Sequence, residues 1–444
     1  MRKLLTSIFL FILLATSVQA KNTKADIETV LKDSDVDIES IAISIKNANT
    51  GKVLYSLNDK MLMNPASVQK LLTTPVIVET LGSEYNFTTE LYKRADNEYL
   101  IKLGADPYFT ELDLKKIVAQ INKEVSKIYI DDFALDSKTW GEGWQWDDDM
   151  NILMPRFGSY NMDKNLLRLT IMPTENGQFA TILNPSKYPI VFFNNIITSD
   201  KTKVEVQRDN SISANTLMLT GTVSRPTVIQ IPVVNLKRYF NNQLTKSLEN
   251  RNIYLKDSFQ ITRKNNDDIL IFETTHNISQ AIEDILKNSN NLATETLFKL
   301  AGAKYSNLVS GTDAAGIKMF NDYCSKNKID NSRIRITDAS GVSKNNLVSA
   351  DFVSEFLKIN KDNVVLKSLP SPGEGTLTHR LLPIKQNLKA KTGTLSDISS
   401  IAGFLTTKQG ENLVFCIIIN DTKLSIYDKK NLEDYIIREA FLRL

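Results

Sequence analysis

The sequence predicts a mixed α/β domain that is interrupted by a large β-rich insertion. A β-hairpin followed by a helix stands near the start of the chain, and two strands followed by a helix close it. Between these ends, from about residue 85 to about residue 231, short β-rich runs alternate with turns rich in Asn, Asp, Ser and Gly. These patterns place both ends of the chain in one α/β domain and the middle in an insertion of one or two subdomains.

Length and composition are those of a folded globular protein. The chain has 444 residues, of which 42% are hydrophobic and 24% are charged. This length provides for two or three domains with large cores, and this composition excludes wholesale disorder.

The first 20 residues have the features of a secretory signal peptide. Arg2 and Lys3 precede an apolar run at residues 4–15, and the small-residue site Val18-Gln19-Ala20 follows. An uncleaved membrane anchor is the alternative, but the run is short for a bilayer span. We therefore expect a mature chain that begins at Lys21 and has no transmembrane anchor. No cysteine stands at the cleavage site, so we do not expect a lipoprotein anchor.

The charge balance argues against a nucleic-acid partner. Removing the two basic residues of the leader leaves 52 basic residues (54 − 2) against 51 acidic residues, a net charge of +1. We see no broad basic patch of the kind that binds nucleic acid.

Cys324 and Cys416 are the only cysteines. A disulfide in an oxidising compartment is possible in principle. However, Cys416 lies within NLVFCIIIN (residues 412–420), a predicted buried strand where cysteine packs as a small hydrophobe. We expect two free thiols. The sequence has no ligand cluster for a metal site.

The expected elements follow one another in a simple order. A hairpin occupies residues 41–59, where apolar and polar residues alternate on both sides of Asn49-Thr50-Gly51. A helix headed by Ser67 comes next. Helical periodicity returns at residues 278–305, after the β-rich middle. Two strands at 389–407 and 412–420 and a final helix at 429–444 complete the chain.

Ser67 and Lys70 stand three residues apart in NPASVQKLLTT (residues 64–74). Residues at this spacing share one face of a helix, so the two side chains can meet. A serine hydroxyl becomes an effective nucleophile when a base removes its proton. Lysine can be that base when burial or a nearby cation destabilises its ammonium form. The apolar residues after Lys70 provide such burial, although this spacing alone is common in surface helices.

Two further stretches complete a set of three motifs. NSNNLATE places a serine and an asparagine two residues apart at a break between helices: Ser289 and Asn291. KAKTGTL places four consecutive residues on a strand: Lys391, Thr392, Gly393 and Thr394. In this order, S-x-x-K, S-x-N and K-T-G form the motif set of the serine penicillin-binding proteins and β-lactamases. Asn290 replaces the aspartate that is commoner at the middle position of the second motif.

The chain resembles one branch of these enzymes, the class C low-molecular-mass penicillin-binding proteins, which are D-alanyl-D-alanine carboxypeptidases and endopeptidases. In that family a large insertion separates the first two motifs, and here residues 68–288 lie between Ser67 and Ser289. Four other stretches share the likeness: LGADPYFT (103–110), WGEGWQWDDD (140–149), DASGVS (338–343) and GEGTLTHRL (373–381).

The resemblance implies a fold and a division into domains. The fold would be a β-lactamase/DD-peptidase-like transpeptidase domain, an antiparallel sheet flanked by helices. Residues 21–86 and 246–444 would form this domain, and residues 87–245 would form the inserted β-rich subdomains.

The resemblance also implies the catalytic roles. Ser67 would attack the carbonyl of the penultimate D-alanine and carry the acyl group, while Lys70 would accept its proton. Ser289 would relay a proton to the leaving D-alanine. The backbone N–H groups of Ser67 and Thr394 would form the oxyanion hole, in which each donor is typically worth about 3 kcal/mol.

The remaining motif residues would bind the substrate. Asn291 would hydrogen-bond its peptide amide, and Lys391 would hold the positive potential of the site and keep Lys70 partly deprotonated. The hydroxyl groups of Thr392 and Thr394 suit the terminal carboxylate. Gly393 would leave room for the substrate along the strand.

An acidic stretch in the insertion suggests a recognition residue. WGEGWQWDDD contains all three tryptophans and three consecutive aspartates. In the family, a carboxylate from this insertion meets the free amine of the stem peptide, and the likeness places that role on Asp148. A solvated acidic turn is the alternative interpretation.

The implied partners are peptidoglycan stem peptides as substrates and β-lactam antibiotics as covalent inhibitors, and no cofactor is implied. A signal peptide on a wall enzyme favours the periplasm.

Three alternatives stay open. A serine β-lactamase shares the motifs, but we find no dedicated deacylating glutamate and the long insertion does not fit one. A wall module that binds penicillin slowly without turnover is the second. The third is a Ser-His-Asp triad built on His276 or His379, although the sequence has no G-x-S-x-G motif.

Overall fold

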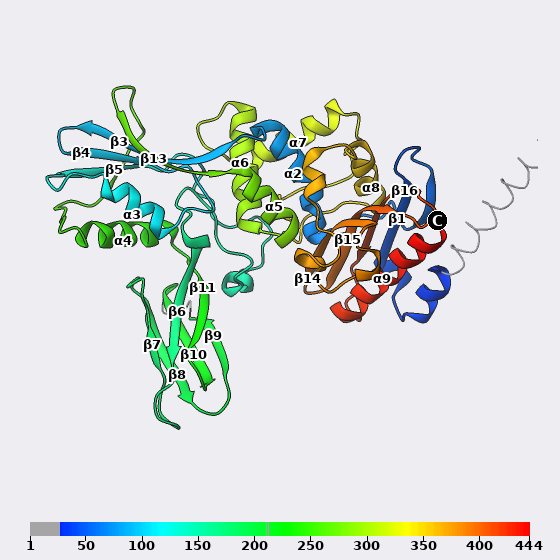
Figure 1. Cartoon of the computed structure of the whole chain (residues 1–444), viewed down its shortest axis with the longest axis horizontal. Coiled ribbons are helices and arrows are strands. Elements are labelled where there is room, and N and C mark those ends of the chain that lie inside the picture. Colours follow the sequence, from blue (N-terminus) through cyan, green and yellow to red (C-terminus); the bar gives the residue numbers. More distant parts are fainter. Residues whose placement is uncertain (1–26, 210, 212) are drawn as a thin grey trace, which may run out of the picture. The chain divides into compact units, whose positions relative to one another are not determined.

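The computed structural model describes residues 27–209, 211 and 213–444, so the expected signal peptide at 1–20 lies outside the described residues. The chain divides into two compact units, which Figure 1 shows in the colours of the sequence. Unit 1 comprises Met1–Ser83, Ser279–Asn290 and Asp313–Leu444, and unit 2 comprises Glu84–Ile278 and Asn291–Thr312. Unit 2 therefore takes in residues 84–86, 246–278 and 291–312 in addition to the expected insertion at 87–245.

Unit 1 is built on a five-stranded antiparallel sheet in the order β14-β15-β16-β1-β2. Its strands are β1 (Ile41–Asn47), β2 (Val53–Leu57), β14 (Leu388–Leu395), β15 (Ile398–Thr406) and β16 (Asn412–Ile419). Strand β1 pairs with β16, so that Ser44 lies opposite Cys416. Strands from both ends of the chain thus form one sheet, and the predicted mixed α/β fold with an antiparallel sheet is confirmed.

Helices cover both faces of this sheet. The helices assigned wholly or mainly to unit 1 are α2 (Lys70–Leu81), α5 (Ile278–Asn288), α7 (Asp313–Lys326), α8 (Ala350–Ile359) and α9 (Ile426–Arg443). Side chains alternate along a strand, so Ile43 and Ile45 pack into one core with Ile436 of α9, while Ser44 points to the other face. There its Oγ hydrogen-bonds that of Ser354 on α8 at 2.8 Å. Burial on both faces explains why β16 is apolar from Leu413 to Ile419.

Unit 2 contains a five-stranded mixed sheet in the order β12-β5-β4-β3-β13. Its strands are β3 (Asn86–Ala95), β4 (Glu98–Lys102), β5 (Lys127–Asp131), β12 (Gln260–Ile261) and β13 (Ile269–Asn277). Strand β5 runs parallel to both of its neighbours, whereas β3 is antiparallel to β4 and β13.

Two three-stranded sheets complete the β-rich part of unit 2, in the orders β8-β10-β9 and β11-β6-β7 (Figure 1). Their strands are β6 (Leu166–Met172), β7 (Thr181–Leu183), β8 (Val191–Thr198), β9 (Lys203–Arg208), β10 (Thr216–Val223) and β11 (Thr227–Pro232). Leu169 from one sheet and Leu219 from the other are buried in a common hydrophobic core. The predicted β-rich middle is present.

Unit 2 also contains helices within the stretch expected to be β-rich. They are α3 (Glu111–Ala119) and α4 (Leu236–Glu249), and α6 (Asn291–Ser306) follows later in the chain. Local signals for both were present: Thr110 and Asp113 form a capping box at α3, and Asn235 caps α4. These two helices were not predicted, because β-rich runs precede and follow them in the sequence.

Both cysteines are buried and free. Burial raises the pKa of the Cys324 thiol to about 12, and it also raises the pKa of Cys416 on β16. Within the described residues, no helix has the length and apolar character needed to span a membrane.

Candidate active site

Ser67 and Lys70 meet at the start of α2. Ser67 lies in the 3₁₀ turn Ala66–Gln69 and Lys70 is the first residue of the α-helix, so the helix begins one turn later than predicted. The Nζ atom of Lys70 donates to Ser67 Oγ at 3.0 Å and to the carbonyl oxygen of Ser340 at 2.7 Å. The Lys70 residue is completely buried. A buried amine in contact with a hydroxyl is the arrangement needed to remove the proton from that hydroxyl.

The backbone immediately before Ser67 is held in an unusual conformation. Ala66 has a φ of 45°, in the left-handed region that alanine rarely adopts. The side chain of Asn64 stabilises it: Oδ1 accepts from Ala66 N at 2.9 Å, and Nδ2 donates to Ser343 O at 2.9 Å. Such a conformation persists only where its surroundings enforce it, and it is common at active sites.

The DASGVS stretch places the carbonyl that Lys70 contacts. The buried carboxylate of Asp338 accepts from Gly341 N at 2.8 Å and from Ser343 N at 2.6 Å. These bonds fold the loop so that Ser340 O points to Lys70. Gly341 is required here, because a Cβ on it would lie 1.9 Å from Ala66 O. The family resemblance included this stretch without implying a role for it, although an Asp followed three residues later by Gly is a turn signal.

Lys391 is a second buried lysine of unit 1, on the strand that approaches Ser67. It lies on β14, completely buried, and its Nζ donates to Thr392 O at 2.7 Å. Burial holds the pKa of Lys391 well below its ordinary value, and the charge of Lys70 lowers it further. Two positively charged lysines repel each other in a site that is shielded from water. This repulsion favours the loss of a proton from one of them.

Gly393 lets β14 approach the nucleophile closely. A Cβ at this position would lie 2.4 Å from Ser400 Oγ, 2.8 Å from Ser67 N and 2.9 Å from Pro65 O. Ser400 Oγ in turn donates to Pro65 O at 2.6 Å. Glycine is therefore required here because the backbone before Ser67 occupies the space of a side chain. This requirement is separate from the expected one, which is room for a substrate along the strand.

A threonine from another loop contacts the K-T-G strand. Thr392 Oγ1 donates to Thr376 Oγ1 at 2.7 Å. The loop that carries Thr376 is fixed at its far end by Arg380, whose Nη2 lies 2.8 Å from Glu433 Oε2 and 2.6 Å from Asp434 Oδ1 on α9. Thr394, two residues along β14, is exposed to solvent.

Ser289 occupies the turn that follows α5 and has a φ of 63°. The residues on either side of it are tied to one carboxylate: Asn288 Nδ2 donates to Asp284 Oδ1 at 2.9 Å, and Asn290 Nδ2 donates to Asp284 Oδ2 at 2.6 Å. Asp284 thus shapes the turn that presents Ser289, and the amide of Asn290 suits this bond better than an aspartate would. No sequence motif had pointed to Asp284.

Asn291 and Asp148 belong to unit 2, and their expected roles stay predictions. Asn291 is the first residue of α6, and its Nδ2 donates to Leu153 O at 2.7 Å. Asp148 is half-buried in the 3₁₀ turn Trp146–Met150. The next residue, Asp149, forms an ion pair with Arg208 at 3.0 Å, so the acidic run is not simply a solvated turn.

The histidines do not form a serine triad with a described hydroxyl. Nδ1 of His276 lies 2.5 Å from Asp106 Oδ2, and Nε2 lies 3.8 Å from Asp113 Oδ2, so both ring nitrogens face carboxylates. The hydrogen bond to Asp106 raises the pKa of His276. His379 is exposed. Among the described residues, no group of three His, Cys, Asp or Glu side chains is arranged to hold a metal.

Comparison with known proteins reveals relatives along most of the chain. Residues 23–440 match the family model described as the D-Ala-D-Ala carboxypeptidase 3 (S13) family. The D-alanyl-D-alanine carboxypeptidase DacB of Haemophilus influenzae is 24% identical over 413 residues, which are 86% of this chain and 85% of that protein. The D-alanyl-D-alanine carboxypeptidase of Actinomadura sp. (strain R39) is 24% identical over 445 residues, 91% of this chain and 82% of that protein.

A solved structure shares the fold. The crystal structure of penicillin binding protein 4 (dacB) from Haemophilus influenzae matches with a TM-score of 0.81 at 21% identity, over 94% of this chain and 99% of that one. The same protein in complex with a β-lactam matches with a TM-score of 0.75.

Proposed function

We propose that this chain, which belongs to the D-Ala-D-Ala carboxypeptidase 3 (S13) family, removes the terminal D-alanine of peptidoglycan stem peptides through an acyl-enzyme on Ser67. The chain is an enzyme of the serine-type D-Ala-D-Ala carboxypeptidase class. The observation that carries the assignment to Ser67 is the 3.0 Å contact between its Oγ and the Nζ of buried Lys70.

Acylation begins when Ser67 Oγ attacks the carbonyl carbon of the penultimate D-alanine. The O–C bond forms as the proton of Oγ moves to the neutral amine of Lys70. The negative charge on the carbonyl oxygen is stabilised by the backbone N–H groups of Ser67 and Thr394. The close approach of Gly393 to Ser67 N supports this role, because it brings β14 alongside the first donor.

Collapse of the tetrahedral intermediate breaks the C–N bond to the terminal D-alanine. The leaving amine takes the proton that Lys70 had accepted, relayed through Ser289, so that Lys70 is neutral again. Water then attacks the ester carbonyl as Lys70 accepts a proton from it. Lys70 returns this proton to Ser67 Oγ as the ester bond breaks and the shortened stem peptide is released. Burial and mutual repulsion leave Lys70 and Lys391 sharing one positive charge. In the proposed mechanism this charge resides on Lys391 when Lys70 acts as the base.

The hydroxyl groups of Thr392 and Thr394 bind the terminal carboxylate of the substrate. In the free enzyme the Thr392 hydroxyl donates its proton to Thr376 Oγ1. When substrate binds, this proton turns to the carboxylate, and Thr376 donates to Thr392 in its place. Gly393 leaves the strand free of a side chain beside the substrate. Asn291 hydrogen-bonds the peptide amide, and Asp148 binds the free amine of the stem peptide.

β-Lactam antibiotics acylate the same serine. Their strained carbonyl takes the place of the D-alanine carbonyl, and the Haemophilus influenzae protein described above was solved in complex with such a compound. The enzyme acts in the periplasm, which the predicted signal peptide at residues 1–20 supports.

Defined muropeptides test this function. Purified mature protein is incubated with a pentapeptide monomer and with a cross-linked dimer, and the products are identified by mass. We expect the monomer to lose one D-alanine, and Ser67→Ala to abolish this loss. Products formed equally fast by Ser67→Ala would overturn the assignment. Rapid hydrolysis of benzylpenicillin without D-alanine release would identify a β-lactamase instead, and acylation without any turnover would identify a penicillin-binding wall module.

A further inference from the structure

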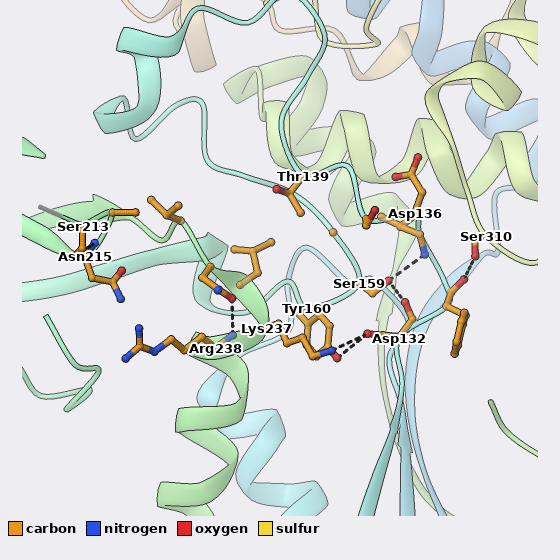
Figure 2. A pocket seen from close by; sticks show the side chains of 18 residues that line it. Asp132, Asp136, Thr139, Ser159, Tyr160, Ser213, Asn215, Lys237, Arg238 and Ser310 are labelled. Carbon is orange, nitrogen blue, oxygen red and sulfur yellow. Dashed lines mark hydrogen bonds and ion pairs between the residues drawn. The ribbon is translucent and has the colours of Figure 1, made fainter. Parts of the chain in front are cut away.

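A cavity of about 690 Å³ lies wholly within unit 2 (Figure 2). Its walls come from five places: the loop after β5, the segment Gly158–Tyr160, the turn before β10, the start of α4 and Ser310, which follows α6. The volume is in the range of about 300–1,000 Å³ that small-molecule sites occupy. None of the residues assigned to the peptidase reaction lines it.

The walls are fixed by hydrogen bonds before any ligand arrives. Ser159 Oγ donates to Asp132 O at 2.6 Å and accepts from Leu135 N at 3.0 Å. Ser310 Oγ donates to Phe133 O at 2.7 Å. Because the loop after β5 is held in this way, binding does not have to order it, and less of the interaction free energy is lost.

One end of the cavity is cationic. Lys237 and Arg238 lie in the first turn of α4, where the capping side chain of Asn235 accepts from Arg238 N at 2.9 Å. The N-terminus of a helix carries a partial positive charge, which adds to the charge of these side chains. Arg238 is exposed, and its guanidinium has no ion-pair partner in the described part of the chain. This end suits a carboxylate.

The opposite side of the cavity carries two carboxylates, each beside a lysine: Asp136 beside Lys299, and Asp132 beside Lys237. Asp136 Oδ1 pairs with buried Lys299 at 2.7 Å, and the second oxygen of Asp136 remains able to accept from a ligand because its side chain is 28% exposed. Asp132 Oδ2 accepts from Tyr160 OH at 2.8 Å and lies 3.8 Å from Lys237 Nζ. This end suits an ammonium group.

The two ends are separated by the width of the cavity. In Figure 2, Arg238 lies on one side and Asp136 on the other, with Tyr160 and Lys237 between them. Leu135 and Leu236 add apolar lining. A ligand that satisfies this arrangement has an anionic group, a short partly apolar stretch and a cationic group.

We propose that this cavity binds a short peptide that carries both a carboxylate and a free amine, namely a second peptidoglycan stem peptide in addition to the one cleaved at Ser67. The carboxylate lies at Arg238 and the N-terminus of α4, and the amine lies at Asp136. The choice of a stem peptide as the ligand rests on the proposed function. The need for a ligand with a carboxylate and an amine rests only on the charged residues of the cavity. The site would hold the enzyme on the cell wall between cleavage events.

The test uses the full mature enzyme after acylation with benzylpenicillin, so that Ser67 is blocked. The probe is a disaccharide tetrapeptide with a free side-chain amine, and its dissociation constant is measured by calorimetry. We expect one site per chain, binding weakened about tenfold or more in Arg238→Gln, and largely retained binding in Arg238→Lys. Acetylating the amine of the probe should weaken binding similarly.

Arg225→Gln is the matched control, because Arg225 is also an exposed arginine of unit 2 but does not line the cavity. It should bind the probe as the unchanged enzyme does. All three variants should be acylated by benzylpenicillin at the unchanged rate, since none alters the peptidase site.

Absence of probe binding to the acylated enzyme, or an equal dissociation constant for Arg238→Gln and the unchanged enzyme, would overturn the second site and leave the peptidase function intact. An enzyme that benzylpenicillin does not acylate would instead overturn the proposed function, and with it the choice of a stem peptide as the ligand.

Discussion

The Nζ atom of Lys70 donates a 3.0 Å hydrogen bond to Oγ of Ser67, and the Lys70 residue is fully buried. Neither group would be reactive alone, because a serine hydroxyl is a weak nucleophile and an exposed lysine is fully protonated at neutral pH. In the proposed mechanism, the burial of Lys70 and the proximity of Lys391 make this serine and this lysine a nucleophile and its base.

Ser67 is expected to be the acylated residue. A labelled penicillin should add one covalent adduct per chain, and peptide mapping by mass should place it on the peptide that contains Ser67. Ser67→Ala should abolish the adduct. A label that survives this change would show that another residue is the nucleophile.

Lys70→Arg should slow acylation by about two to four orders of magnitude, the usual contribution of general-base catalysis. The change keeps a positive charge, but a guanidinium stays protonated at any usable pH and cannot accept the proton of Ser67. Stopped-flow measurement of benzylpenicillin acylation checks this. Rates close to those of the unchanged enzyme would place the base elsewhere.

Asp338→Asn should slow acylation without weakening the initial binding of benzylpenicillin. The amide group of asparagine would face one of the two backbone N–H groups that the carboxylate now accepts from, Gly341 N and Ser343 N. A buried donor left without an acceptor costs about 1–3 kcal/mol, so the loop shifts and Ser340 O leaves Lys70. Kinetics over a range of penicillin concentrations separate the two steps.

The control is Asp330→Asn, because Asp330 is exposed and lies outside this loop. This variant should match the unchanged enzyme in both steps. If Asp338→Asn affects binding and acylation equally, the residue serves the fold in general and does not position the base.

Asp148→Asn should lower kcat/KM about tenfold to a hundredfold for stem peptides that carry a free side-chain amine. A charge-assisted hydrogen bond to an ammonium group is worth about 1–3 kcal/mol when partly desolvated. Acylation by benzylpenicillin, which lacks that amine, should stay nearly unchanged. Asp147→Asn, at the exposed neighbouring position, is the matched control. Equal losses on both substrates would assign Asp148 to the fold or the chemistry.

The contact between His276 and Asp106 should make stability depend on pH. The hydrogen bond raises the pKa of His276 in the folded state above its ordinary value of 6.5. A group with a raised folded-state pKa contributes stability that is fully present below the unfolded-state pKa and is lost as the pH rises through the folded-state pKa. The difference in Tm between the unchanged protein and His276→Gln should therefore be larger at pH 5.5 than at pH 8.5.

His379→Gln is the control for this measurement, because His379 is exposed and has no carboxylate partner among the described residues. Its Tm should differ little from that of the unchanged protein at either pH. A Tm difference for His276→Gln that is the same at both pH values would show that the charge of the imidazole does not stabilise the fold.

Local sequence was sufficient for features whose partners are close along the chain. The spacing of Ser67 and Lys70 predicted that their hydroxyl and amine would meet on one turn, and the structure brings them to 3.0 Å. Alternating residues predicted the hairpin at 41–59, and the apolar residues within 412–420 predicted a buried strand, which is β16. The order of the three motifs indicated the family, and the match over residues 23–440 confirms it.

Long-range packing established what surrounds those residues. Ser340 O contacts Lys70 across 270 positions of sequence, and Thr376 supports Thr392 from a separate loop. Gly393 is needed because β14 lies against the backbone of Ser67. The residues next to a side chain in sequence restrict its backbone conformation and the face of the helix or strand on which it lies. They do not determine which distant loop packs against that face. That choice is made by the burial of whole elements, and it supplies the carbonyl, the hydroxyl and the close approach that turn a serine and a lysine into a candidate site.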